Sequence, residues 1–289
     1  MQLFALDTKK QLVSANHAQK QNDYLCTECG SIVRLRGGEH RQKHFYHLKP
    51  DRQCRQSQKS LNHIQVQKYL QKILPTGECS LEQRFPEIQR IADVVWEPKK
   101  IIFEVQCSGI TAEEIRSRNK DYLSVGYNVI WILHDNRFNK WKVTAAERFL
   151  KGSPHYFTNI DPKGRGFVYD QVDTIGEGVR KPVKLRCRVN LSLPKALEDR
   201  ESVSTKEIPN LLEKRLELWP IFFGDDVMDR WIQSDQKTVT ALQEIYHAER
   251  ILSQHQQLPL AAKVKRFLYR YFVRPYLLLF QIFLEKACR

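Results

Sequence analysis

The 289-residue sequence lacks a long uninterrupted apolar run, an internal repeat and a low-complexity tract. Its longest apolar stretch, Tyr276 to Leu284, is interrupted by Gln281 and falls short of the roughly 20 residues that a membrane-spanning helix needs. We therefore expect no membrane span. The stretch is typical of a helix that packs on the rest of the protein, and a helix lying on a membrane surface is the alternative.

The first residues lack the pattern of a secretion signal, because the apolar patch within Met1 to Lys10 is short and follows no basic start. We therefore expect a cytoplasmic protein. The seven cysteines are an odd number in a long chain, which argues against a disulfide framework. Metal binding or free thiols are the uses of cysteine that remain.

Acidic residues are scarce relative to basic ones, with 33 Asp and Glu against 47 Lys and Arg, which gives a net charge of +14. Such an excess attracts polyanions, since each Lys or Arg that neutralises a phosphate releases a counterion. Nucleic acid is therefore the partner class that we expect. The alternative is a basic surface that is merely solvated.

Cysteine and histidine concentrate between residues 24 and 54. Cys26 and Cys29 form a Cys-x2-Cys knuckle, and His44, His47 and Cys54 follow within thirty residues. This spacing is typical of a structural zinc site, and free thiols are the alternative. These five residues are candidates for the four ligands of a tetrahedral zinc site.

His44 and His47 are an odd number of residues apart, so in one regular strand they would point to opposite faces and only one could bind the metal. We favour Cys26, Cys29, His47 and Cys54 as ligands, with His44 as the substitute. The residues between them include four basic ones that could reach phosphates or simply face solvent: Arg34, Arg36, Arg41 and Lys43.

The middle of the chain reads as a mixed α/β core. A helical period over 60–74 is followed by Pro75, and a capping box of Thr111 and Glu114 opens a second helix to about Ser124. Extended segments are expected at about 81–85, 88–96, 101–107 and 127–133. The region 153–180 reads as a long loop or an irregular sheet, and helices are expected from about 205 onward.

Two acids stand in the arms of one expected hairpin. If its turn lies between Pro98 and Lys99, Asp93 faces Glu104, and Gln106 shares the face of Glu104. Opposed carboxylates repel unless a cation lies between them, and Mg²⁺ suits such oxygen ligands. The alternative is that both acids lie on the solvated face of the hairpin.

His63 begins the apolar stripe of the first expected helix and should face the sheet. It is a candidate to assist catalysis at the two carboxylates. The alternative is an ordinary core histidine.

Several ordered motifs between residues 24 and 134 resemble the CoiA-like competence family: YLCTECG, HFYH, SLNH, RIADVVW, FEVQCSGI and RNKDY to GYNVIWIL. The resemblance implies a zinc-ribbon-like N-terminal part and a nuclease-like domain of the restriction-endonuclease, PD-(D/E)xK, type. Its metal-binding acids would be Asp93 and Glu104, holding Mg²⁺ or Mn²⁺. The family role is to process or escort DNA during natural transformation, with a RecA-type recombinase as a possible partner.

Two positions depart from the family pattern. Gln106 stands where the superfamily usually has Lys, and Gln can orient a water but carries no charge. Gln58-Lys59-Ser60 stands where the family tends to have an acid before the helix histidine. Cleavage is therefore not guaranteed by membership.

These observations predict an α/β protein with three parts: a zinc-binding module at 1–57, a restriction-endonuclease-like core at 58–150 and a helical C-terminal region at 151–289. The expected function is a metal-dependent nuclease that acts on incoming or branched DNA and promotes recombination. The catalytic candidates are Asp93, Glu104, Gln106 and His63. Two alternatives are a DNA-binding module that does not cut and a nuclease with a defence or repair role.

Overall fold

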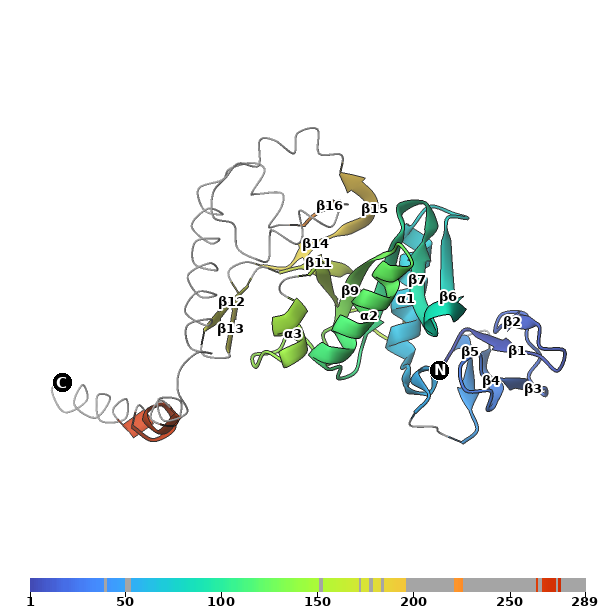
Figure 1. Cartoon of the computed structure of the whole chain (residues 1–289), viewed down its shortest axis with the longest axis horizontal. Helices are drawn as coiled ribbons and strands as arrows, with labels where there is room; N and C mark the ends of the chain where they lie inside the picture. The colour runs from blue at the N-terminus through green and yellow to red at the C-terminus, as the bar shows by residue number, and fades with distance from the viewer. Residues whose placement is uncertain are drawn as a thin grey trace.

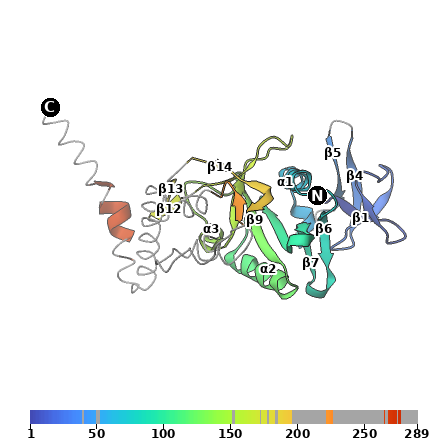
Figure 2. The same cartoon turned by 90° about the horizontal axis from the view of Figure 1, so that it is seen from above.

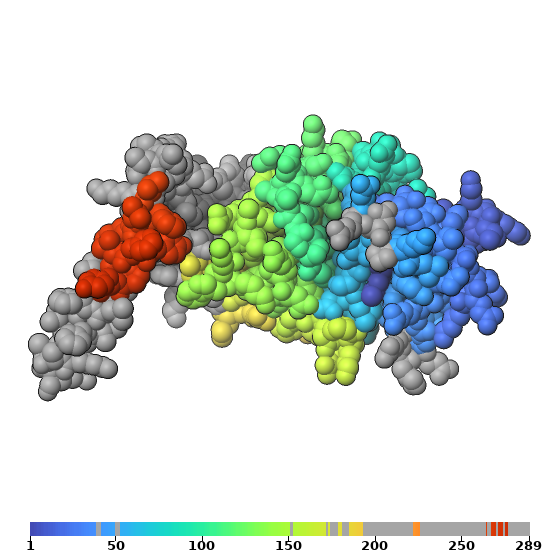
Figure 3. All heavy atoms as spheres, turned by 90° about the horizontal axis from the view of Figure 1, so that it is seen from below, coloured from blue at the N-terminus to red at the C-terminus, as the bar shows by residue number. Residues whose placement is uncertain are grey.

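The computed structural model describes residues 1–38, 41–49, 53–150, 153–171, 173–176, 179–182, 185–195, 221–225 and scattered positions from 264 to 276. Two sheets dominate them, a five-stranded sheet at the N-terminus and a seven-stranded central sheet. The N-terminal sheet lies beside the β6 side of the central sheet (Figure 1). The space-filling view shows the two parts in direct contact (Figure 3).

The N-terminal sheet has the strand order β2-β1-β3-β4-β5 and is antiparallel throughout. Its strands are β1 (Phe4–Leu6), β2 (Leu12–Ser14), β3 (Asp23–Leu25), β4 (Ile32–Gly38) and β5 (Arg41–His47). Its small core joins Tyr24, Val33 and Phe45 to the buried Cys26 and Cys54. A core of this size is typical of modules that a bound metal stabilises.

The central sheet has the order β14-β11-β10-β9-β8-β7-β6. Its strands are β6 (Cys79–Phe85), β7 (Arg90–Trp96), β8 (Ile101–Gln106), β9 (Asn128–His134), β10 (His155–Thr158), β11 (Val168–Asp170) and β14 (Cys187–Arg188). The pairs β8–β9 and β9–β10 are parallel, and the other pairs are antiparallel. This mixed α/β core confirms that part of the expected fold class.

The sheet continues past residue 150, where the sequence places the end of the nuclease-like domain. Strands β10, β11 and β14 are only two to four residues long. Such short strands among glycines and prolines carry little periodicity, so the sequence pattern left open whether this region is loop or sheet.

Helices α1 (Leu61–Ile73) and α2 (Ala112–Ser124) cover opposite faces of the central sheet (Figure 2). Ser60 caps α1 by accepting a hydrogen bond from the His63 amide, and Thr111 caps α2 through the Glu114 amide, as the capping box predicts. One core cluster joins Ile64, Val66 and Leu70 to the α1 face of the sheet. The other joins Ile115 and Tyr122 to the α2 face.

The alternation of faces along β7 breaks at Asp93. Val94 packs in the core on the α1 side, whereas Ala92, two residues away, packs in the core on the α2 side. Opposite them on β6, Leu81 pairs with Val94 and Gln83 with Ala92, while Glu82 between them has a φ of 50°. This local twist redirects the Asp93 side chain.

The remaining described elements are short: η1 (Arg55–Gln58), η2 (Pro86–Ile88), η3 (Glu97–Lys99), α3 (Ala145–Leu150), β12 (Asp173–Gly176), β13 (Val179–Pro182), β15 (Asn190–Lys195), β16 (Ile221–Phe223) and the π-helical turn η4 (Tyr269–Val273). Most of the predicted C-terminal helices lie outside the described residues. None of the helices that the structure does describe is long and apolar enough to cross a membrane.

Candidate functional site

Four side chains of the N-terminal part form a Cys3His cluster: Cys26, Cys29, His47 and Cys54, whose ligand atoms all lie within 4.8 Å of one another. The Cys26 and Cys54 sulfurs are 3.7 Å apart, and His47 Nε2 is 3.4 Å from Cys29 Sγ and 3.5 Å from Cys54 Sγ. Zinc held tetrahedrally would separate two sulfurs by about 3.8 Å and a sulfur from a nitrogen by about 3.6 Å. The cluster therefore fits a structural zinc site.

Burial raises the pKa of the Cys26 and Cys54 thiols, so a cation is needed to hold both as thiolates in this setting. His44 is not one of the four residues whose ligand atoms come together, and its Nδ1 lies 2.9 Å from the Gln42 carbonyl oxygen. The cluster contains His47 and not His44, which agrees with the preferred ligand set. The two histidines lie in the same strand, β5, as the parity argument assumed.

A cavity of about 540 Å³ opens where the N-terminal part meets the central sheet. Its walls come from the Cys-x2-Cys knuckle at Glu28, from η1 at Arg55 and from His63 in α1 with Lys59 just before that helix. Glu114 and Arg118 of α2 complete them. Asp93 and Gln106 reach it from β7 and β8. Residues far apart in the sequence thus form one pocket.

The predicted hairpin register is confirmed along β7 and β8, where Trp96 pairs with Ile101, Val95 with Ile102 and Val94 with Phe103. The paired positions end at Val94, one step before the predicted pair of Asp93 and Glu104. Beyond Val94, however, the Asp93 side chain itself takes part in the strand contact, because its Oδ2 accepts a hydrogen bond from the Val105 amide at 2.9 Å.

The Asp93 carboxylate is held from the α1 side. Its Oδ1 lies 2.9 Å from Lys59 Nζ, 2.9 Å from His63 Nε2 and 3.0 Å from Gln67 Nε2. Burial by itself would raise the pKa of Asp93, but His63 and Lys59 outweigh it and hold this pKa well below its usual range. Asp93 is therefore a buried, ionised carboxylate whose charge the protein already balances.

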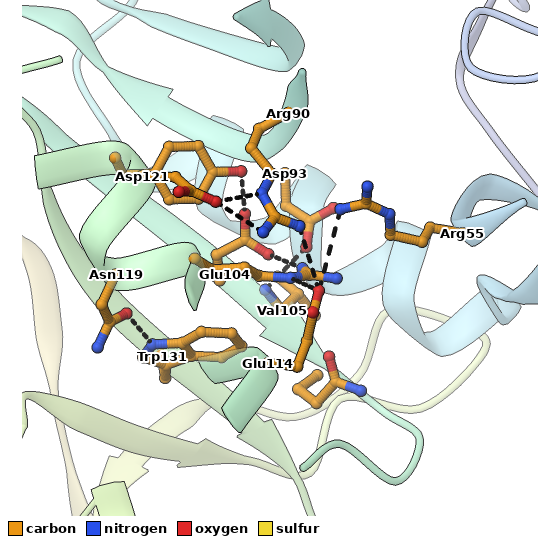
Figure 4. Close-up of polar contacts among 12 residues, drawn as sticks. Arg55, Arg90, Asp93, Glu104, Val105, Glu114, Asn119, Asp121 and Trp131 are labelled. Atoms are coloured by element: carbon orange, nitrogen blue, oxygen red, sulfur yellow. Dashed lines mark hydrogen bonds and ion pairs between the residues drawn. The ribbon is translucent and has the colours of Figure 1, made fainter. Parts of the chain in front are cut away.

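Glu104 is held from the α2 side. Its Oε1 accepts a hydrogen bond from Tyr122 Oη at 2.7 Å, and its Oε2 pairs with Arg118 Nη1 at 2.6 Å. Burial raises the pKa of Glu104 although Arg118 opposes the shift. Figure 4 shows Asp93, Glu104 and Glu114 close together, with Arg55 and Arg90 beside them.

The structure thus brings Asp93 and Gln106 to the pocket together, while Glu104 lies behind Arg118 and is 1% exposed. The expected meeting of all three side chains on one face is only partly seen. The physical reason is the twist at Asp93, which turns its carboxylate toward α1 while Glu104 keeps the regular orientation toward α2.

His63 and Gln106 occupy supporting positions. Because an ionised carboxylate only accepts, His63 Nε2 must donate to Asp93. Burial lowers the pKa of His63, and Asp93 offsets part of that shift. Gln106 Nε2 donates to the Ser108 carbonyl and hydroxyl, so its amide is tethered to the loop that leads to α2.

Sequence reasoning missed most partners of the two acids. Gln67 could have been found, because it follows His63 by four residues on one helix face, and Arg118 and Tyr122 share such a spacing on α2. Lys59 was noted only as a departure from the family pattern. Glu82, whose Oε1 lies 3.2 Å from Lys59 Nζ, carried no recognisable signal.

The carboxylates of Asp93 and Glu104 are hard oxygen ligands on adjacent strands, which is the donor chemistry that Mg²⁺ and Mn²⁺ prefer. Their side chains are close enough for Asp93 to contribute to the raised pKa of Glu104. A cation between the two carboxylates, in addition to Lys59 and Arg118, would relieve that repulsion. The donor set therefore fits a divalent ion that takes the place of protein cations at these carboxylates.

Two family profiles match the sequence. The nuclease-like domain of competence protein CoiA matches residues 41–164, and the N-terminal domain of competence protein CoiA matches residues 7–57. The two matches together span more than half of the chain. No curated protein and no solved structure matches it. The chain, with its zinc-type cluster followed by a nuclease-like sheet, belongs to the competence protein CoiA family.

Proposed function

We propose that this protein is a divalent-metal-dependent deoxyribonuclease of the PD-(D/E)xK type that processes incoming or branched DNA and thereby promotes recombination during natural transformation. The observation that carries the proposal is the pocket in which Asp93, His63 and Gln106 meet. The family match to a nuclease-like domain and the net charge of +14 support it.

Asp93 and Glu104 would hold Mg²⁺ or Mn²⁺, which when bound lowers the pKa of water and stabilises charge on a phosphodiester. His63 and the Val105 amide fix the orientation of the Asp93 carboxylate. Gln106 carries an amide at the pocket that can orient a water through its oxygen. Each residue thus has a distinct task around the reacting phosphate.

The pocket also has cations that suit a DNA backbone, although each is already ion-paired. Arg55 lies 3.1 Å from Glu28, and Arg118 contacts Glu104 and Glu114. A phosphate entering the pocket would exchange with these carboxylates for the same guanidinium groups. Because Glu28 lies between two residues of the Cys3His cluster, the N-terminal part contributes directly to this binding surface.

The test is cleavage of labelled single-stranded and branched DNA with Mg²⁺, Mn²⁺ or EDTA. We expect metal-dependent cutting by the native protein and its loss in Glu104→Gln, which preserves size but removes the charge. Glu97→Gln is the matched control, because Glu97 is a half-exposed acid in the turn of the same hairpin. Equal cutting by the native protein and Glu104→Gln would refute the assignment.

A second candidate is a zinc-containing protein that binds DNA without cutting it and assists a RecA-type recombinase. Two observations favour it: Lys59 neutralises Asp93, and Gln106 carries no charge where the superfamily usually has Lys. DNA retardation in gels without cleavage under any metal would select this candidate. Negligible DNA affinity near physiological salt would exclude both.

A further inference from the structure

Lys59 lies at the centre of a buried charge cluster in the pocket. Its Nζ is 2.9 Å from Asp93 Oδ1 and 3.2 Å from Glu82 Oε1, and its side chain is 9% exposed. The side chains of Glu82 and Asp93 are still more deeply buried. Burial by itself would lower the pKa of Lys59, but the two carboxylates outweigh burial and raise it. The group is therefore a permanent ammonium ion.

The Lys59 ammonium occupies the position at Asp93 Oδ1 that a divalent ion would need. Asp93 Oδ1 already accepts hydrogen bonds from the side chains of Lys59, His63 and Gln67, and Oδ2 accepts one from the Val105 amide. A carboxylate oxygen has about two lone-pair sites, so an ion cannot bind Asp93 while all these donors stay. Among them Lys59 is the one with a permanent charge, and two cations on one oxygen repel each other.

Glu82 provides a place for Lys59 after such an exchange. Glu82 Oε2 accepts hydrogen bonds from the Leu3 and Phe4 amides at 2.9 and 3.3 Å, which anchors the carboxylate and leaves Oε1 for Lys59. If Lys59 leaves Asp93, its ammonium keeps this partner. The exchange therefore strands no unpaired buried charge, which is the expensive outcome.

We propose that Lys59 is an internal counter-ion that competes with the divalent metal for Asp93, with Glu82 as its alternative acceptor. The inference rests on the proposed function, since it concerns the metal site of that reaction. Lys59 thus sets the metal concentration at which the site fills, and it keeps Asp93 charge-balanced when no metal is bound.

The test is Mn²⁺ binding to the full-length protein, followed by electron paramagnetic resonance, with Asp93→Asn defining the signal that depends on Asp93. We expect Lys59→Met to raise the Asp93-dependent affinity about tenfold or more, because a buried ion pair no longer has to be broken. Lys59→Arg keeps the charge and should bind Mn²⁺ no more tightly than the native protein. Glu82→Gln, which takes away the alternative acceptor, should weaken binding.

Thermal unfolding provides an independent readout and guards against a folding defect in Lys59→Met. Without added Mn²⁺ this variant should unfold at a lower temperature than the native protein. Adding Mn²⁺ should raise the unfolding temperature of the variant by more than it raises that of the native protein. Native-like Mn²⁺ affinity in both Lys59→Met and Glu82→Gln would overturn the inference and leave the proposed function standing. Absence of Asp93-dependent Mn²⁺ binding in every variant would instead overturn the metal site of the proposed function.

Discussion

The protein has two places where metal-binding side chains gather, and they differ in what else those side chains contact. In the Cys3His cluster the four ligand atoms all lie within 4.8 Å of one another. At the carboxylate site, Asp93 and Glu104 each face a different helix and are paired with protein cations. The Cys3His cluster needs a bound ion to be stable. The carboxylate site is balanced by protein cations, and a protein cation has to leave a carboxylate before a metal ion can bind there.

The largest effect should come from removing a ligand of the Cys3His cluster. Cys54→Ala should abolish stoichiometric zinc and unfold the N-terminal sheet, because structural zinc binding in small modules is worth about 10–16 kcal/mol. Zinc content by mass spectrometry and thermal unfolding would measure this. His44→Ala is the matched control, since His44 is buried nearby but lies outside the cluster. Full zinc content in Cys54→Ala would contradict the assignment.

An intermediate effect is expected from Asp93→Ala. The change leaves Lys59 with one acceptor and deprives His63 and the Val105 amide of theirs, so we expect a loss of about 3–5 kcal/mol in the free energy of unfolding. Urea unfolding would measure it.

The comparison variant for that measurement is Asp121→Ala, which breaks a less buried pair with Arg90. Because Arg90 keeps Glu114 and Ser117 as acceptors, its cost should be about 1 kcal/mol or less. Similar costs for the two variants would show that the Asp93 network is no more than an ordinary ion pair.

The smallest effect should come from Ser60→Ala, which removes the cap of α1. We expect a loss of about 1 kcal/mol and an unchanged zinc content, because the cap stabilises the helix that carries His63 and not the Cys3His cluster. Urea unfolding and zinc analysis would check both statements. A drop in zinc content would mean that the two sites are more tightly coupled than their separate contacts indicate.

Sequence patterns predicted the elements around the site well where the signal is local. The helices at 60–74 and from Thr111 onward and the three strands of the hairpin region follow from periodicity and capping, and the structure confirms them. Parity indicates that only one of His44 and His47 can join the cysteines, and the cluster contains one of them, His47. The strands beyond 150 are ambiguous in the sequence because they are too short to show a period.

The sequence by itself determined the metal-binding residue types, the Cys-x2-Cys spacing and the hairpin register, because each depends on residues close together in the chain. Only the tertiary structure decided that Asp93 turns toward α1, that Lys59 lies between Asp93 and Glu82, and that Glu104 pairs with Arg118. Those contacts join residues 14 to 34 positions apart and depend on a local twist at Glu82 and Asp93 that no repeating pattern encodes. Burial then fixed their charges, since paired ions inside a protein lose the water that would otherwise separate them.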